Sequence, residues 1–79
     1  MNPDSNSFEI IFGEEKLKVQ RHSVGSQTIF RIIFSNSKAP LVITRASGAN
    51  GHRFWTSIPE GRQKEAEAIG PFIEQYYKN

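Results

Sequence analysis

The side chains that could serve as acids, bases or metal ligands in this chain are few. It has 79 residues, no cysteine, two histidines and eight acidic residues. His22 and His52 lie 30 positions apart with no carboxylate near either in the sequence, and the sole aspartate, Asp4, is close to the amino terminus. Because catalysis needs a nucleophile with a base, a pair of acids or a metal, we expect no catalytic residue, no metal ligand, no cofactor and no small-molecule substrate.

Two further motifs suggest chemistry but fit other roles. Glu65 and Glu67 flank Ala66 and would point in different directions on a helix, which is typical of a solvated face. The segment 48–51, Gly-Ala-Asn-Gly, joins two expected strands, whereas a phosphate-binding loop joins a strand to a helix. The sequence therefore favours a non-enzymatic binding module over an enzyme.

Positive charge is confined to one part of the chain. Residues 1–15 contain four acidic side chains and no basic one, and residues 60–79 contain four glutamates and three cations. Residues 16–59 contain no acidic side chain and seven cations: Lys16, Lys18, Arg21, Arg31, Lys38, Arg45 and Arg53. A localised positive field of this kind attracts phosphates or acidic partners.

Hydrophobic periodicity predicts about five strands followed by one helix. Alternating or β-rich runs bounded by turn residues place the strands at 8–12, 15–24, 28–34, 41–47 and 53–58. After Pro59 apolar residues recur at helical spacing, but Gly70-Pro71 interrupts them and predicts a kink or two short helices. The fold class is therefore α+β: an antiparallel β-meander of about five strands, with one C-terminal helix packed on one face.

The expected organisation is a flexible polar tail at residues 1–7 and a single α+β domain at residues 8–79. The tail lacks the basic and apolar regions of a secretory signal, and no apolar run reaches the roughly 18 residues of a membrane span. We therefore expect a cytoplasmic protein that does not contact a membrane. Since disulfides are excluded, self-association is the support left for the narrow stability margin of so small a domain.

The Asn-Gly pair at 50–51 predicts the turn of the last hairpin, since both positions of a type I′ turn need a positive φ. A two-residue loop at this point sets Ala46 opposite Trp55. Opposed residues share a face of the sheet. Phe54 and Ile58 are therefore expected in the core, and Trp55 on the face away from the helix.

The helix can cover only one face of this sheet, and we assign it the more apolar one. That face comprises Phe8, Ile10, Phe12, Leu17, Val19, Phe30, Ile32, Phe34, Leu41, Ile43, Phe54 and Ile58. The opposite face is basic, carries aliphatic side chains and contains the only tryptophan: Lys16, Lys18, Gln20, His22, Ile29, Arg31, Ile33, Val42, Thr44, Ala46, Arg53, Trp55 and Ser57. Such a face is not ordinary solvated surface, so a partner is expected to cover it.

Two partners fit the basic face. Single-stranded DNA or RNA would place phosphates on the cations and an unpaired base on the tryptophan. The residues expected to bind it are Lys18, His22, Arg31, Arg53 and Trp55. A second copy of the chain would instead pack on the aliphatic side chains, which makes a protein-interaction or structural homodimer the alternative function. A third interpretation is a strongly curled sheet that buries these aliphatics itself.

Three strand arginines call for partners. Arg31 lies in an otherwise apolar strand, where a buried charge needs a partner unless its head reaches water. Arg21 and Arg45 are expected near strand ends on the helix-covered face. Their expected partners are helix glutamates such as Glu65 or Glu67.

In element order and charge, the stretch from Glu15 to Tyr77 resembles the purine-rich-element-binding (PUR) family and the related single-strand-binding transcription cofactors. In those proteins the strands also come first and one helix last. The resemblance implies single-stranded nucleic-acid binding on a curved basic sheet, and dimerisation. The strand expected at 8–12 departs from the four-strand pattern of the family.

Overall fold

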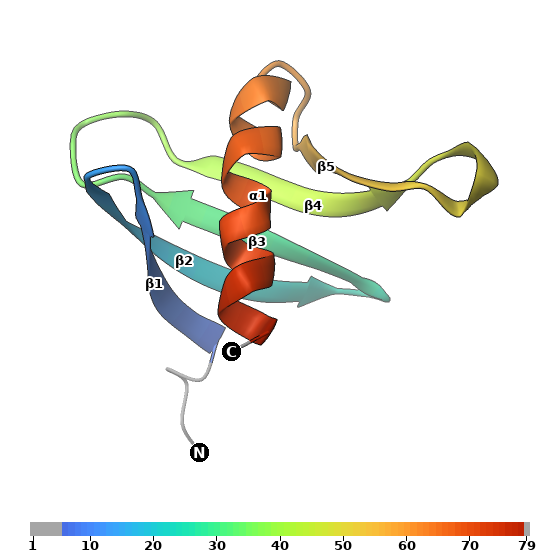
Figure 1. Ribbon diagram of the computed structural model, residues 1–79, viewed down its shortest axis with the longest axis horizontal. Helices are drawn as coiled ribbons and strands as arrows, with labels where there is room; N and C mark the ends of the chain where they lie inside the picture. The colour runs from blue at the N-terminus through green and yellow to red at the C-terminus, as the bar shows by residue number, and fades with distance from the viewer. Residues whose placement is uncertain (1–5, 79) are drawn as a thin grey trace.

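The computed structural model describes residues 6–78, which form one antiparallel sheet and one long helix (Figure 1). The elements are β1 (Ser7–Phe12), β2 (Glu15–Val24), β3 (Gln27–Ile33), β4 (Leu41–Ser47), a short 3-10 turn η2 (Ala49–Gly51), β5 (Arg53–Ser57) and α1 (Gln63–Lys78). The strands lie in the order β1-β2-β3-β4-β5. The predicted α+β meander with a C-terminal helix is therefore confirmed. Of the tail predicted at 1–7, residues 1–5 lie outside the described part, and Ser7 already belongs to β1.

The first two hairpins follow directly from alternation and from glycine. Leu17 and Val19 are buried in β2, while Lys18 between them is exposed. Each hairpin turns at a glycine with a left-handed backbone, Gly13 at φ +66° and Gly25 at φ +63°. Glycine adopts this conformation without steric cost, which suits it to tight turns between antiparallel strands.

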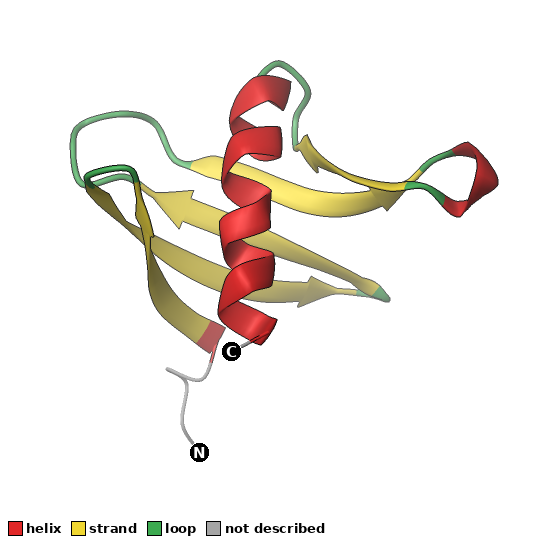
Figure 2. Cartoon of the chain, viewed as in Figure 1, coloured by secondary structure: helices red, strands yellow, loops and turns green. Residues whose placement is uncertain are grey.

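Helix α1 crosses the sheet diagonally and contacts both of its edge strands, β1 and β5 (Figures 1 and 2). Its buried side chains, Ala66, Ile69 and Ile73, recur at helical spacing. At its C-terminal end, Tyr76 stacks on Phe8 of β1 with ring centroids 4.0 Å apart. One core therefore fills the space between sheet and helix: Phe8, Ile10, Leu17, Val19, Phe30, Ile32, Phe34, Leu41, Ile43, Trp55, Ala66, Ile69 and Ile73.

The Gly70-Pro71 pair does not divide the helix in two, because α1 runs from Gln63 to Lys78 with Pro71 inside it. Proline lacks the N–H that would bond to the carbonyl four residues earlier, that of Glu67. Glu67 and Pro71 are both exposed, so water can bond to that carbonyl. Of the two predicted alternatives, a kink or two short helices, the second is therefore wrong, and the single C-terminal helix of the predicted fold is confirmed.

The last hairpin differs from the predicted register by one residue. Ala46 lies opposite Phe54, not opposite Trp55. The loop has three residues, 49–51, and closes where the Gly48 N–H donates to the His52 carbonyl at 2.6 Å. The Asn-Gly pair does adopt positive φ, +62° and +74°, but within this longer loop.

This shift turns the side chains of β5 over, because a slip of one residue in a strand moves every side chain to the other face. Trp55 and Ser57 face the helix and are buried. Phe54 and Ile58, which were expected in the core, are exposed at 38% and 41%. The predicted core was therefore wrong at β5.

The outer edge of β5 is covered by the first residue of the helix. Backbone groups of the even-numbered residues of β5 point toward β4, as the bond from the Ile58 N–H to the Val42 carbonyl at 2.8 Å indicates. The Trp55 carbonyl therefore points outward, and Gln63 Nε2 donates to it at 2.6 Å. Gln63 Oε1 also accepts a bond from the Thr56 hydroxyl at 2.9 Å.

The helix packs directly against the Trp55 side chain. It is 7% exposed, its ring lies edge-on to Phe30 at 5.8 Å, and its Nε1 donates to Glu74 Oε2 at 2.8 Å. Gly70 packs against the indole so closely that a Cβ at this position would overlap the ring. This close contact with the Trp55 ring explains why a glycine lies in the middle of the helix.

We predict that Gly70→Ala destabilises the protein by about 2 kcal/mol, since the overlap with the Trp55 ring outweighs the better helix propensity of alanine. Urea unfolding followed by circular dichroism measures the change. In a Trp55→Leu background the same substitution should lose its cost or become stabilising. A stabilised Gly70→Ala single variant would contradict this account of the packing.

Candidate functional site

The sheet face turned away from α1, called here the open face, carries three of the five predicted binding residues. Lys18 lies opposite Ile33, Arg31 opposite Val42, and His22 opposite Ile29. All three predicted residues, Lys18, His22 and Arg31, are exposed. Alternation along β2 and β3 was sufficient to place them together.

The other two predicted residues, Trp55 and Arg53, do not join this group. Trp55 is buried on the helix side, so its placement on the basic face is wrong. Arg53 alternates with Trp55 along β5 and lies opposite Ser47 at the far end of the hairpin. The cause in both cases is the loop at 49–51, which shifts the register by one residue.

Phe54 takes the position on the open face that was expected for Trp55, and sequence reasoning missed it. It lies opposite Ala46, and one ring edge approaches Gly48 in the adjoining loop. A signal for the correct register was present in the helix. Gly70 occupies a position that faces the sheet, between Ile69 and Ile73, and a glycine there indicates that a neighbouring side chain approaches the helix closely.

The aliphatic side chains of the open face are partly covered by one another. Ile29, Ile33 and Val42, on the central strands, are half-buried. Toward the two edges, Ile11 is 57% exposed and Ile58 41%. Apolar surface on this face is therefore more exposed at its two edges than at its centre.

The charge of the open face is positive. Among residues 6–78, Glu9 is the one carboxylate that the strands place there, and it lies 3.8 Å from Lys16. Lys18 and Arg31 form no ion pair within the described residues. Two unpaired cations therefore lie beside an apolar strip formed by the half-buried side chains of Ile29, Ile33 and Val42. This agrees with the combination of basic and aliphatic side chains predicted for this face.

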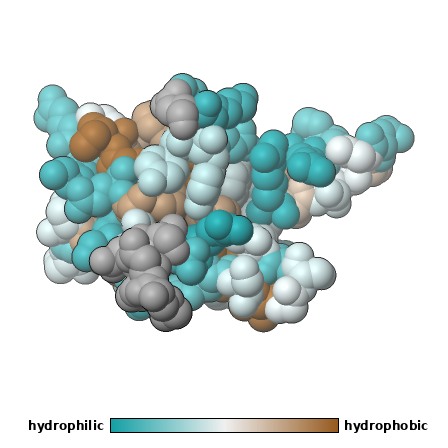
Figure 3. Space-filling view, turned by 90° about the horizontal axis from the view of Figure 1, so that it is seen from below, coloured by the Kyte–Doolittle hydropathy of each residue, from teal (hydrophilic) through white to brown (hydrophobic). Residues whose placement is uncertain are grey.

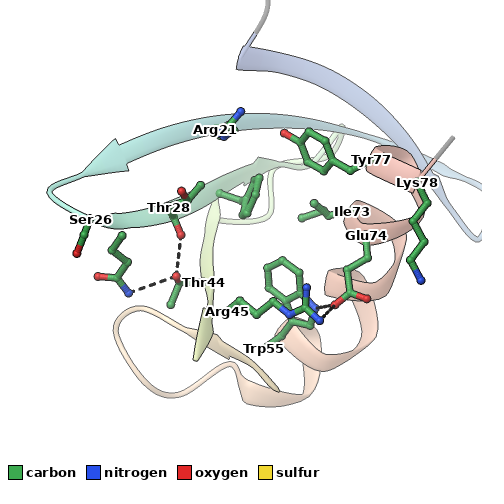
Figure 4. Close-up of a pocket in the computed structure, with 12 residues that line it drawn as sticks. Arg21, Ser26, Thr28, Thr44, Arg45, Trp55, Ile73, Glu74, Tyr77 and Lys78 are labelled. Carbon is green, nitrogen blue, oxygen red and sulfur yellow. Dashed lines mark hydrogen bonds and ion pairs between the residues drawn. The ribbon is translucent and has the colours of Figure 1, made fainter. Parts of the chain in front are cut away.

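A cleft of about 700 Å³ lies on the helix side, where the sheet divides. The pairing of β3 with β4 ends at Ile29 and Thr44, while the flanking hairpins continue beyond that point. The space-filling view shows the two hairpin ends as separate projections with a notch between them (Figure 3). The cleft opens between these hairpins, next to the last turns of α1 (Figure 4).

Within the cleft, Arg45 and Glu74 point toward each other from β4 and α1 (Figure 4). Arg45 Nη2 lies 3.2 Å from Glu74 Oε2, and its guanidinium lies 5.9 Å from the centre of the Trp55 ring. Arg45 therefore pairs with a helix glutamate as expected, although with Glu74 and not with Glu65 or Glu67. Arg21 also lines the cleft but forms no ion pair inside the described range.

One carboxyl group has a strongly shifted pKa, and its role is structural. Hydrogen bonds from Arg62 and Lys38 lower the pKa of Glu65 from 4.5 to about 2. Arg62 Nε lies 2.7 Å from Glu65, and Arg62 Nη1 donates to the carbonyls of Ala39 and Pro40 at 3.1 and 2.8 Å. This network ties the loop after β3 to the start of α1, so the lowered pKa does not indicate a catalytic acid.

We predict that Glu65→Gln lowers the free energy of unfolding at pH 7 by about 1 kcal/mol. Because the folded-state pKa is lowered, the ion pairs contribute fully above the unfolded pKa near 4.5 and lose their contribution as pH falls toward 2. The difference between variant and wild type should therefore decrease below pH 4.5 and vanish only once the pH has fallen below about 2. Urea unfolding at several pH values measures it, and a difference that is independent of pH would refute the assignment.

Both histidines, His22 and His52, are exposed. Over residues 6–78 no group of three or more histidine, aspartate or glutamate side chains could hold a metal ion. In the same range no helix has both the length and the apolar character to cross a membrane.

Comparison with protein-family models, with curated proteins and with solved structures finds no match to this chain. The class that the described residues define is an α+β fold with a positively charged open sheet face and a separate cleft beside the helix.

Proposed function

We propose that this protein is a non-enzymatic binding module that takes single-stranded DNA or RNA on its open face. The observation that carries the proposal is the pair of exposed, unpaired cations, Lys18 and Arg31, beside an apolar strip. His22 lies on the same face. Cations that neutralise phosphates and apolar groups that contact bases are the two components of single-strand binding.

Phe54 is the aromatic side chain available for stacking on this face. It is 38% exposed, whereas the Trp55 ring is buried against the helix and cannot stack on a base. Stacking of an unpaired base on an aromatic ring contributes about 1–3 kcal/mol. A duplex hides its bases from such a ring, so the combination of phenylalanine and half-buried aliphatics favours a single strand over a duplex.

The proposal predicts salt-dependent binding that depends on the open face. Fluorescence anisotropy of labelled single-stranded and duplex oligonucleotides over a salt series measures it. Arg31→Gln or Lys18→Gln should weaken binding and lower the slope of log K against log salt by about 1 for each phosphate that is no longer neutralised. Phe54→Ala should weaken single-strand binding about tenfold.

Lys64→Gln is the matched control, because Lys64 is an exposed cation on α1 rather than on the sheet. It removes the same charge and should leave affinity and salt slope nearly unchanged. Equal losses for Lys64→Gln and Arg31→Gln would indicate non-specific attraction to the net charge. Absence of binding at low salt would refute the proposal.

A second candidate function, homodimer formation through the same face, is favoured by its exposed apolar edges. Ile11 and Ile58 are 57% and 41% exposed, and Phe54 lies between Ile58 and the hairpin loop. Burial of such side chains against a twofold-related copy would remove apolar surface from water.

For this second candidate we predict a monomer–dimer equilibrium in sedimentation velocity that Ile58→Lys shifts to monomer. Phe72→Lys is the control, since Phe72 is 40% exposed, close to the value for Ile58, but lies on α1 on the other side of the sheet. A chain that remains monomeric at millimolar concentration would exclude the dimer and leave the nucleic-acid proposal unaffected.

A further inference from the structure

The cleft between the two hairpins has a floor made of core side chains. Phe30, Trp55 and Ile73 line it, and they are 8%, 7% and 1% exposed. A concave site of this size with an apolar floor is typical of small-molecule binding, for which about 300–1,000 Å³ is usual.

The wall formed by the sheet is polar and held in place by hydrogen bonds across the split. Thr44, which is 3% exposed, donates its hydroxyl to the Thr28 carbonyl at 2.8 Å. Gln27 Nε2 donates to the same hydroxyl at 3.2 Å. These bonds join β3 to β4 where the backbone pairing has ended, so the cleft is formed before any ligand arrives.

The charge around the cleft is positive. Arg21, Arg45 and Lys78 line it, against the single carboxylate of Glu74. The Oε2 atom of Glu74 already accepts a bond from Trp55 Nε1 and contacts Arg45. Arg21 and Lys78 form no ion pair within the part of the chain that the structure describes. Guanidinium groups bind carboxylates and phosphates in two-pronged geometry.

We propose that this cleft binds a small organic anion with a flat apolar body, which carries a carboxylate or a phosphate group. The apolar body would lie on Phe30 and Trp55, and the anionic group would meet Arg21, which comes from β2 on the side of the cleft away from the Arg45–Glu74 pair (Figure 4). The site goes beyond the proposed nucleic-acid function. It faces the helix, whereas Lys18 and Arg31 are on the opposite side of the sheet.

The single tryptophan makes the proposal directly testable, because its indole N–H gives one resolved signal in a ¹⁵N–¹H correlation spectrum. Two anions serve as probes: benzoate for an aromatic carboxylate and adenosine monophosphate for a nucleoside phosphate. We expect at least one of them to shift the Trp55 indole signal in a saturable manner at millimolar concentration. Whichever binds more tightly identifies the anionic group that the site prefers.

Neutral analogues and two arginine variants complete the experiment. Benzyl alcohol and adenosine lack the charge and should bind at least tenfold more weakly than their anions. Arg21→Gln should raise the dissociation constant about tenfold, as expected when a charge-assisted hydrogen bond is removed. Arg53→Gln, a matched change outside the cleft, should leave it unchanged.

Three results would overturn the proposal. They are the lack of a saturable Trp55 shift with either anion, equal binding of the neutral analogues, and equal effects of Arg21→Gln and Arg53→Gln. Failure of the nucleic-acid proposal is distinguished in the same spectra, since that ligand would shift the amides around Lys18 and Arg31 instead. A shift confined to those open-face amides would also count against the cleft.

Discussion

The contact between the Trp55 ring and Gly70 is the constraint on which the rest of this structure depends. It sets the distance between α1 and β5, and it orients the indole so that Nε1 meets Glu74. Glu74 in turn holds Arg45 at the mouth of the cleft. Through this one contact, the helix that completes the core also fixes the polar groups of the cleft and turns Phe54 to the opposite face.

Local sequence patterns were sufficient for most of the fold. Period-two alternation in β2, glycines at tight turns and apolar residues at helical spacing each act over a few residues, so they can be recognised without knowledge of distant contacts. The loop at 49–51 is different. Its Asn-Gly pair fits a two-residue or a three-residue loop, and only the longer loop places the Trp55 ring against Gly70, about 15 positions away in the sequence.

The same distinction between local patterns and distant contacts explains which residues of the candidate sites could be predicted. Lys18, His22 and Arg31 could be grouped from alternation in two adjacent strands whose turn was identified correctly. Trp55 and Arg53 could not be placed, because their face depends on the register of the last hairpin. The cleft could not be predicted at all, since it arises where pairing between β3 and β4 stops at Ile29 and Thr44, and no local pattern marks that point.

Coverage of the β5 edge by Gln63 has a consequence for how copies of this protein could be joined into larger sheets. A strand added beside β5 would have to displace the bond from Gln63 to the Trp55 carbonyl. Among the described strands, that leaves β1 as the edge where an added strand meets no such obstacle. Sheet extension through β1 would pair two copies around a twofold axis and leave only protected edges outside. Such growth would end in a closed pair rather than continue into a filament.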